Sequence, residues 1–134
     1  MAEKVKIMVV DDHQLLREAF ASVLNDFEFI EVIGMAENGV QALELLKTVE
    51  PDILFLDIEM PGMNAFEMLN LLKPFTFEVI FTTAYNQFAV RAFKENAADY
   101  LLKPIEKSDL ILAVDKLLTK ENINSQQKME TLLQ

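Results

Sequence analysis

The fold is decided by an early stretch, Val5-Lys6-Ile7-Met8-Val9-Val10-Asp11-Asp12, in which an apolar run ends abruptly in two carboxylates. A short run with little polar alternation is typical of a strand buried on both faces of a parallel sheet. The arrangement recurs, because Asp57 follows the run Ile53–Leu56 and Lys103 follows Tyr100–Leu102. Ligands bind just beyond the carboxyl ends of the strands of an open parallel sheet. We therefore expect these charged residues to share one pocket.

Short apolar runs alternate with amphipathic segments along the chain. This alternation predicts right-handed βαβ units, and hence a parallel sheet with helices on both faces. The expected strands are 7–10, 31–35, 53–56, 79–82 and 100–102, and the expected helices carry apolar stripes over 16–27, 40–49, 66–72, 88–93 and 110–117.

Composition and charge narrow the class of protein. A chain of 134 residues that is 51% hydrophobic fits one globular domain with a substantial core. The net charge of -10 argues against this chain alone binding nucleic acid. Cysteine is absent, which excludes disulfides and thiolate metal sites. With no membrane-length apolar stretch and no signal-peptide layout, we expect a cytoplasmic protein with no membrane partner.

The acidic residues at the strand ends have the chemistry of a divalent cation site. Three clustered carboxylates repel each other unless a cation lies among them, and Mg²⁺ prefers oxygen ligands. We expect Asp12 and Asp57 to supply one oxygen each, with Asp11 close by and a backbone carbonyl just after Asp57 as a further ligand. Aspartate is also a nucleophile toward phosphorus, and phosphoryl transfer needs mainly positioning and charge stabilisation.

Three further residues complete this pocket. Lys103 is expected to pair with the carboxylates and, when a phosphoryl group is present, with one of its oxygens. Thr83 offers a hydroxyl at the same rim, and the small Ala84 leaves room for a phosphoryl group. Each feature alone has a structural explanation, since aspartates often cap helices. His13 is interpreted as a helix-start residue without a catalytic role. The joint pattern favours function, because independent structural explanations would not place all of these residues at strand ends.

Four motifs, in this order, resemble the receiver domains of two-component response regulators. They are Val9-Val10-Asp11-Asp12-His13, Leu56-Asp57-Ile58-Glu59-Met60-Pro61-Gly62-Met63, Thr82-Thr83-Ala84 and Tyr100-Leu101-Leu102-Lys103-Pro104. The resemblance covers roughly residues 4–119. It implies an α/β, flavodoxin-like, doubly wound five-stranded parallel sheet of order 2-1-3-4-5 with five helices. It also implies a cis peptide bond between Lys103 and Pro104.

The resemblance assigns a role to each residue at the metal end of the pocket. Asp57 matches the phosphoacceptor, which receives its phosphoryl group from a sensor histidine kinase. Asp12, Asp57 and the backbone of Glu59 match the Mg²⁺ ligands, with Asp11 in support. The chain is then a signalling module and not a turnover enzyme, with Mg²⁺-dependent self-phosphorylation and autodephosphorylation as its only chemistry.

The resemblance also identifies residues that bind and report the phosphoryl group. Lys103 matches the phosphoryl-binding lysine, and Thr83 and Tyr100 match the pair of residues that switches after phosphorylation. Asp57, Lys103 and Thr83 therefore carry the chemistry. We expect the phosphorylated state to favour a homodimer, since regulators of paired DNA half-sites commonly need two-fold symmetry.

The output of the module is expected to lie outside this chain. Residues 80–85, 89–93 and 96–105 resemble receivers joined to LytTR DNA-binding domains, whereas residues 11–18 resemble receivers joined to a helix-turn-helix domain. The longer match favours LytTR. From Thr119 the sequence becomes polar, so we predict a receiver domain over 1–119 and a linker, or the start of a connection to an absent output domain, over 120–134. DNA would be reached only through that domain.

Three rival interpretations use the same pattern. A stand-alone receiver would act only by docking on other proteins. A haloacid-dehalogenase-type phosphatase would also use a strand-end aspartate followed by an acid, as in Asp57-Ile58-Glu59, but it begins from an Asp-x-Asp motif and usually needs a longer chain. A flavodoxin would need a phosphate-binding loop after its first strand, where Asp11 and Asp12 would repel phosphate.

Overall fold

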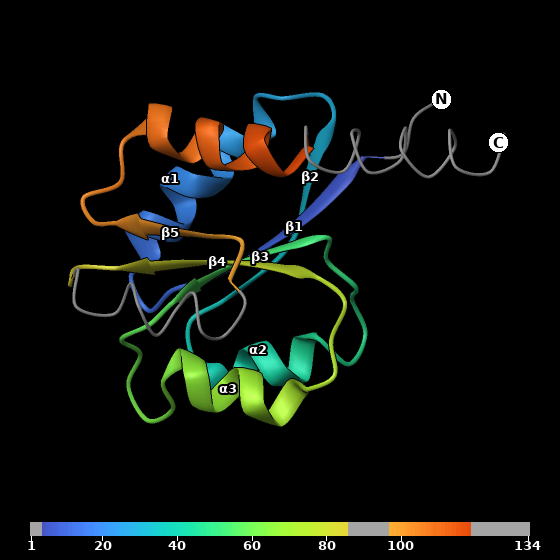
Figure 1. The fold of residues 1–134 in the computed structure, drawn as a ribbon, viewed down its shortest axis with the longest axis vertical. Helices are drawn as coiled ribbons and strands as arrows, with labels where there is room; N and C mark the ends of the chain where they lie inside the picture. The colour runs from blue at the N-terminus through green and yellow to red at the C-terminus, as the bar shows by residue number, and fades with distance from the viewer. Residues whose placement is uncertain (1–3, 86–96, 119–134) are drawn as a thin grey trace, which may run out of the picture. The chain divides into compact units, whose positions relative to one another are not determined.

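The computed structural model describes residues 4–85 and 97–118. Its strands form one parallel sheet in the order β2-β1-β3-β4-β5, as Figure 1 shows. This is the predicted doubly wound, flavodoxin-like order, and each predicted strand is present. The strands are β1 (Val5–Val10), β2 (Ile30–Ala36), β3 (Ile53–Asp57), β4 (Glu78–Thr83) and β5 (Asp99–Leu102).

The burial of each strand follows its place in the sheet. Every residue of the central strand β3 is buried, and so are the last four residues of its neighbour β1. In the edge strand β2, only Ile30 and Ala36 are buried. Central strands of a parallel sheet are covered on both faces, which is why their sequences lack polar alternation.

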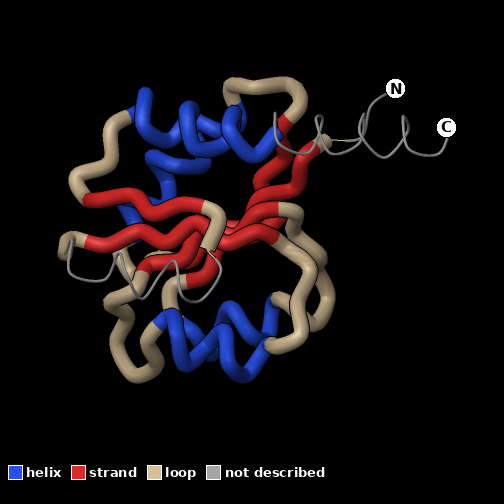
Figure 2. The backbone as a smooth tube through the Cα atoms, viewed as in Figure 1, coloured by secondary structure: helices blue, strands red, loops and turns tan. Residues whose placement is uncertain are grey.

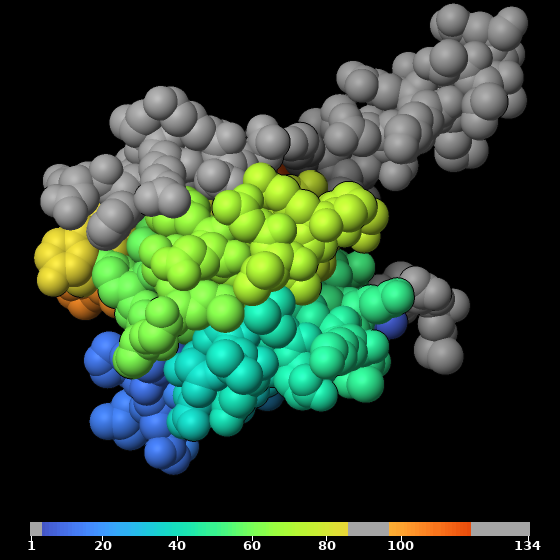
Figure 3. Space-filling model, turned by 90° about the horizontal axis from the view of Figure 1, so that it is seen from below, coloured from blue at the N-terminus to red at the C-terminus, as the bar shows by residue number. Residues whose placement is uncertain are grey.

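Helices cover both faces of the sheet (Figures 1 and 2). Helix α1 (Gln14–Asn25) lies on one face, while α2 (Gly39–Leu45) and α3 (Ala65–Leu72) lie side by side on the other (Figure 3). Phe20 of α1 meets Phe55 of β3 edge to face, with ring centroids 5.5 Å apart. The sheet therefore has an apolar layer on each side, and its carboxyl edge stays open for the polar residues.

Asparagine side chains begin the two helices on the second face. Asn38 accepts a hydrogen bond from the Gln41 backbone N–H at 2.8 Å, and Asn64 accepts one from the Glu67 N–H at 2.9 Å. Such N-caps satisfy donors that a helix start leaves unpaired. They fix where α2 and α3 begin, and thereby the loops that precede them at the carboxyl edge of the sheet.

Two helices end earlier than the apolar stripes predicted. Helix α1 stops at Asn25, so Phe27 lies beyond it, and α2 stops at Leu45, so Val49 lies beyond it. After α2, the Thr48 N–H bonds the Leu45 carbonyl three residues back, which tightens the chain into a turn. Pro51 follows and disfavours helical conformation in the residue before it. Val49 still packs against the core, so the helical spacing of apolar residues continues beyond the end of α2.

The chain divides after Lys103 into two compact units, and the strands and α1 to α3 belong to the first. In the second unit, residues 107–118 are helical, as predicted from the stripe over 110–117. The helix predicted over 88–93 and the linker predicted over 120–134 lie outside the described residues. Within the part of the chain that is described, no helix is long and apolar enough to cross a membrane.

The expected cis bond before Pro104 is wrong. Among the described residues, the cis peptide bond precedes Pro74, whereas the bond between Lys103 and Pro104 is trans. The Lys103 N–H donates to the Thr83 carbonyl at 2.7 Å, which extends the pairing of β4 with β5 by one residue. This hydrogen bond fixes the start of the lysine side chain at the sheet edge without a cis bond.

Candidate functional site

The carboxyl ends of β1, β3 and β5 bring three charged side chains together, as predicted. Lys103 Nζ lies 2.9 Å from Asp11 Oδ2 and 3.4 Å from Asp57 Oδ2. The two aspartates are almost wholly buried, with 2% and 1% of their surfaces exposed. Lys103 is therefore the counter-ion of two carboxylates that water barely reaches.

Asp12 joins this cluster together with a residue that sequence reasoning set aside. One ligand atom from each of Asp11, Asp12, His13 and Asp57 lies within 4.8 Å of the others. The His13 Nδ1 atom is 3.2 Å from Asp11 Oδ1 and 3.2 Å from Asp12 Oδ1. His13 directly precedes α1, so the helix-start interpretation is also right. Its adjacency to the two aspartates was the signal that it would lie beside the cluster.

Arg17 is a second residue that sequence reasoning missed. Its Nη1 atom donates to the Asp11 backbone carbonyl at 2.6 Å. Arg17 stands one turn along α1 from His13, whose carbonyl accepts its backbone N–H. A basic residue in the first turn after an acidic pair was the available signal.

The donor set fits a hard divalent cation. Asp11 Oδ2 and Asp12 Oδ1 are buried, and each lies against one nitrogen, Lys103 Nζ at 2.9 Å and His13 Nδ1 at 3.2 Å. Carboxylate oxygens are the ligands that Mg²⁺ prefers, and a cation among them would bind the lone pairs that these contacts leave over. The predicted acidic cluster is thus present, and its chemistry suits Mg²⁺.

Burial and like charge dominate the electrostatics of Asp57. Burial raises the pKa of its carboxyl, the charge of Asp11 and a hydrogen bond with Asp12 raise it further, and the charge of Glu59 adds to them. The Lys103 charge lowers the pKa without cancelling these effects, so it reaches about 8. Burial would lower the pKa of Lys103 itself, but Asp11 and Asp57 outweigh it and raise that pKa. Without a metal ion, the raised pKa therefore favours the protonated form of Asp57 at neutral pH.

The end of β4 supplies hydrogen-bond donors on the other side of Asp57. The Thr83 hydroxyl donates to Glu59 Oε1, and the Ala84 backbone N–H donates to the same oxygen at 3.3 Å. The Glu59 N–H in turn donates to Asp57 Oδ1 at 3.2 Å. Sequence reasoning expected only the backbone of Glu59 to take part. No sequence signal pointed to its side chain, since the contact depends on how the loop after β3 folds back on β4.

Tyr100 lies one strand further along the sheet. Tyr100 pairs with Phe81 of β4 in the sheet, and the Tyr100 hydroxyl donates to the Tyr85 carbonyl. The Tyr85 N–H donates to the Thr83 Oγ1 atom at 3.1 Å. A short chain of hydrogen bonds therefore links Thr83 to Tyr100 through the backbone of Tyr85.

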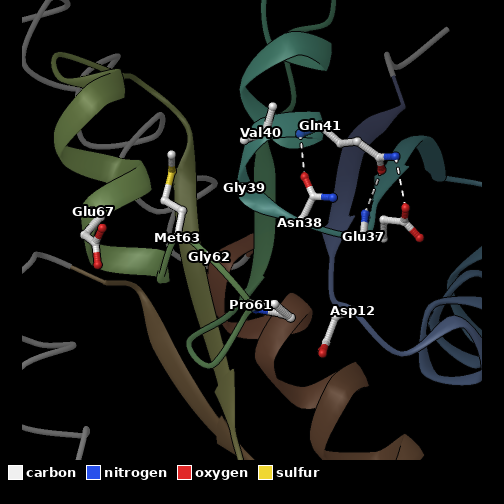
Figure 4. Close-up of a pocket in the computed structure, with 10 residues that line it drawn as sticks. All are labelled: Asp12, Glu37, Asn38, Gly39, Val40, Gln41, Pro61, Gly62, Met63 and Glu67. Carbon is white, nitrogen blue, oxygen red and sulfur yellow. Dashed lines mark hydrogen bonds between the residues drawn. The ribbon is translucent and has the colours of Figure 1, made fainter.

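An open cavity of about 740 Å³ lies beside the acidic cluster (Figure 4). Asp12 stands at one edge of it, and the Met63 side chain lies against Gly39, where an added Cβ would come within 3.0 Å of the sulfur. Gly62 has φ +84°, a left-handed conformation that glycine adopts without strain. The bend at Pro61 and Gly62 thus forms one wall. The lining residues are Asp12, Glu37, Asn38, Gly39, Val40, Gln41, Pro61, Gly62, Met63 and Glu67.

Comparisons with known proteins agree with one another. A family model described as the response regulator receiver domain matches residues 7–115. An uncharacterized response regulatory protein of Vibrio cholerae is 44% identical over 112 residues, which are 83% of this chain and 47% of that protein. The transcriptional regulatory protein BtsR of Salmonella typhimurium is 40% identical over 114 residues, which are 84% of this chain and 48% of BtsR. The chain spans about half the length of these curated relatives.

A solved structure gives the same result for the fold. The response regulatory domain of protein mrkE from Klebsiella pneumoniae superposes with a TM-score of 0.78 at 30% identity. The match covers 86% of this chain and 96% of that domain. The strand order described above is therefore shared with an experimentally solved domain.

Proposed function

Because this chain belongs to the response regulator receiver domain family, we propose that it accepts a phosphoryl group on Asp57 from a sensor histidine kinase. The observation that carries the proposal is the position of Asp57, buried at the end of β3 beside both Lys103 and the acidic pair after β1. A buried carboxylate with one cation beside it and oxygen donors around it suits a nucleophile toward phosphorus.

The transfer requires little covalent chemistry from the protein. An Asp57 carboxylate oxygen attacks phosphorus, and the new P–O bond forms as the bond from phosphorus to the donor nitrogen or oxygen breaks. The bonding electrons leave with the donor group, so a mixed anhydride remains on Asp57. Lys103 Nζ, 3.4 Å from Asp57 Oδ2, then pairs with a phosphoryl oxygen.

Mg²⁺ is the proposed cofactor. Asp12 and Asp57 would hold it directly with the Glu59 backbone carbonyl, and Asp11 would support them. A bound Mg²⁺ supplies positive charge that keeps Asp57 ionised and neutralises the incoming phosphoryl oxygens. The protein's own contribution is to bury the carboxylates and to orient Asp57 through the Glu59 N–H.

The proposed readout uses the hydrogen bonds at the end of β4. A dianion on Asp57 draws the Thr83 hydroxyl toward it, because a phosphoryl group is a strong acceptor. The Tyr85 backbone, which bonds both Thr83 and Tyr100, would carry the change to the Tyr100 ring. This is a shift between two states of one fold.

The proposed output is a separate DNA-binding domain of LytTR type, joined through residues 120–134 to a receiver over 1–119. The relatives' greater length supports an output domain over the stand-alone alternative, and one relative is named a transcriptional regulatory protein. We further propose that phosphorylation favours a homodimer. DNA would then be bound only through the output domain.

Mass spectrometry of the intact protein tests the phosphoacceptor. Incubation with Mg²⁺ and acetyl phosphate should add one phosphate to the natural chain and none to Asp57→Asn. Asp26→Asn, at an exposed helix end, is the matched control and should be labelled normally. Equal labelling of the Asp57 variant would reject the assignment.

A further inference from the structure

The side chain of Glu59 occupies hydrogen-bond donors beside the phosphoacceptor. Its Oε1 atom accepts both the Thr83 hydroxyl and the Ala84 backbone N–H. These donors end β4 directly beside the end of β3, since Asp57 pairs with Thr82 in the sheet. They therefore lie where the oxygens of a group attached to Asp57 would need partners.

The position of the Glu59 side chain leaves one of its two carboxylate oxygens without a hydrogen bond. Its Oε2 atom is buried and has no hydrogen-bond partner in the described structure. Burying a carboxylate oxygen without a donor costs free energy, and such atoms in native structures call for an explanation. One oxygen of Glu59 thus accepts two hydrogen bonds, while the other accepts none. This arrangement suits a carboxylate that a stronger hydrogen-bond acceptor can displace.

Because the Thr83 hydroxyl can donate only one hydrogen bond, its bond to Glu59 excludes a bond to any other acceptor. A threonine hydroxyl has a single proton, and here that proton goes to Glu59. The Thr83 Oγ1 atom also accepts the Tyr85 N–H at 3.1 Å, which fixes its orientation. Thr83 is fully buried, so water cannot take the place of either partner. The hydroxyl cannot reach a phosphoryl oxygen until it leaves Glu59.

We propose that Glu59 is an internal stand-in for the phosphoryl group, a carboxylate that holds the Thr83 and Ala84 donors until phosphorylation displaces it. The inference rests on the proposed function of Asp57. A phosphoryl dianion offers three strong acceptor oxygens and outcompetes a carboxylate for the same donors. Glu59 is thus a positioning residue that opposes phosphorylation and keeps the domain in its unphosphorylated state.

Removing the carboxylate should speed phosphorylation. Glu59→Ala frees both donors and removes a negative charge that repels the incoming anion, so we expect labelling by acetyl phosphate with Mg²⁺ to be about tenfold faster. Glu59→Gln keeps an oxygen that can accept from Thr83 but loses the charge, so its rate should lie between. Glu67→Gln removes an exposed carboxylate outside this contact and serves as the control.

A second measurement does not depend on phosphorylation. In amide NMR spectra of the unmodified protein with Mg²⁺, the Ala84 N–H signal should move upfield in Glu59→Gln, because its acceptor loses its charge. The same signal should stay in place in Glu67→Gln. An unchanged Ala84 signal in Glu59→Gln would overturn the contact on which the proposal stands.

The two measurements separate the possible failures. If the natural chain takes no phosphate on Asp57, the proposed function fails. If the natural chain is labelled, but Glu59→Ala and Glu59→Gln react no faster than Glu67→Gln, the stand-in proposal alone is wrong. A faster reaction in both Glu59 variants, ordered as described, supports it.

Discussion

The two sides of the Asp57 pocket differ in how the fold builds them. The acidic side holds Asp11 and Lys103, each of which directly follows a strand. The donor side holds Glu59 and Thr83, which are 24 residues apart in the chain and meet only because a loop after β3 turns back. Strand ends alone place the charges, whereas the hydrogen bonds of the donor side depend on loop conformation.

The two sides of the pocket also favour ligands of opposite charge. On the acidic side, carboxylates crowd together around one ammonium, so a further cation or a proton is favoured. On the donor side, a carboxylate uses donors and leaves one of its own oxygens bare, so a stronger anion is favoured. The pocket thus suits a metal ion and a phosphoryl group together at Asp57.

The largest expected loss of stability comes from breaking the acidic side. Lys103→Met should lower the free energy of unfolding by about 3 kcal/mol at pH 7 without Mg²⁺, because it leaves the buried Asp11 carboxylate without its counter-ion. Lys47→Met is the matched control, since Lys47 pairs with Glu44 in an exposed i,i+3 ion pair worth little. Urea denaturation measures both. Equal losses in the two variants would mean that the buried ion pairs of Lys103 contribute no more to stability than the exposed pair of Lys47.

The raised pKa of Asp57 predicts a pH dependence of stability in metal-free protein. The folded pKa of about 8 exceeds the unfolded value of 3.8, so the folded state binds the extra proton between them. The stability from this group is full below about pH 4 and is lost as pH rises through 8, with a slope of up to ~1.4 kcal/mol per pH unit. Asp57→Asn should therefore gain stability relative to the natural chain from pH 5 to pH 8. A constant difference between the two chains would contradict the pKa.

Mg²⁺ should stabilise the natural chain more than Asp12→Ala. At concentrations well above its dissociation constant, a bound ion adds about 1–3 kcal/mol, seen as a rise of several degrees in melting temperature. Asp12→Ala should already be more stable than the natural chain without metal, because like charges are fewer, and should gain little from Mg²⁺. Thermal scans with and without Mg²⁺ compare them. An undiminished response in the variant would remove Asp12 from the metal site.

The smallest expected effect on stability comes from the donor side. Thr83→Ala removes two hydrogen bonds, one donated to Glu59 and one accepted from the Tyr85 N–H, and should cost about 1–2 kcal/mol in unfolding free energy. Its larger consequence should be on signalling. Beryllofluoride, a phosphoryl mimic, should shift the amide NMR signals of Tyr85 and Tyr100 in the natural chain but not in Thr83→Ala. Equal shifts in both chains would show that another route carries the change.

The acidic side could be predicted from sequence because its information is local. An apolar run followed by Asp11, or by Lys103, fixes both the strand and the place of the charge at its end. On the donor side, the position of Thr83 was predicted from its strand end, but its contact with the Glu59 side chain was not, since the sequence shows Glu59 only as an acid after Asp57. Its partner depends on which way the loop over 58–64 turns and on the register of β4. The end of α2 was missed for a related reason, because Val49 keeps the apolar period after the helix has stopped.

The phosphorylated residue can be located directly by chemical trapping. Borohydride reduces an aspartyl phosphate to homoserine, which tandem mass spectrometry places in the sequence. After incubation with Mg²⁺ and acetyl phosphate, the natural chain should yield homoserine at position 57 and at no other aspartate. Homoserine at Asp11 or Asp12, or none at position 57, would contradict the assignment of Asp57 as the phosphoacceptor.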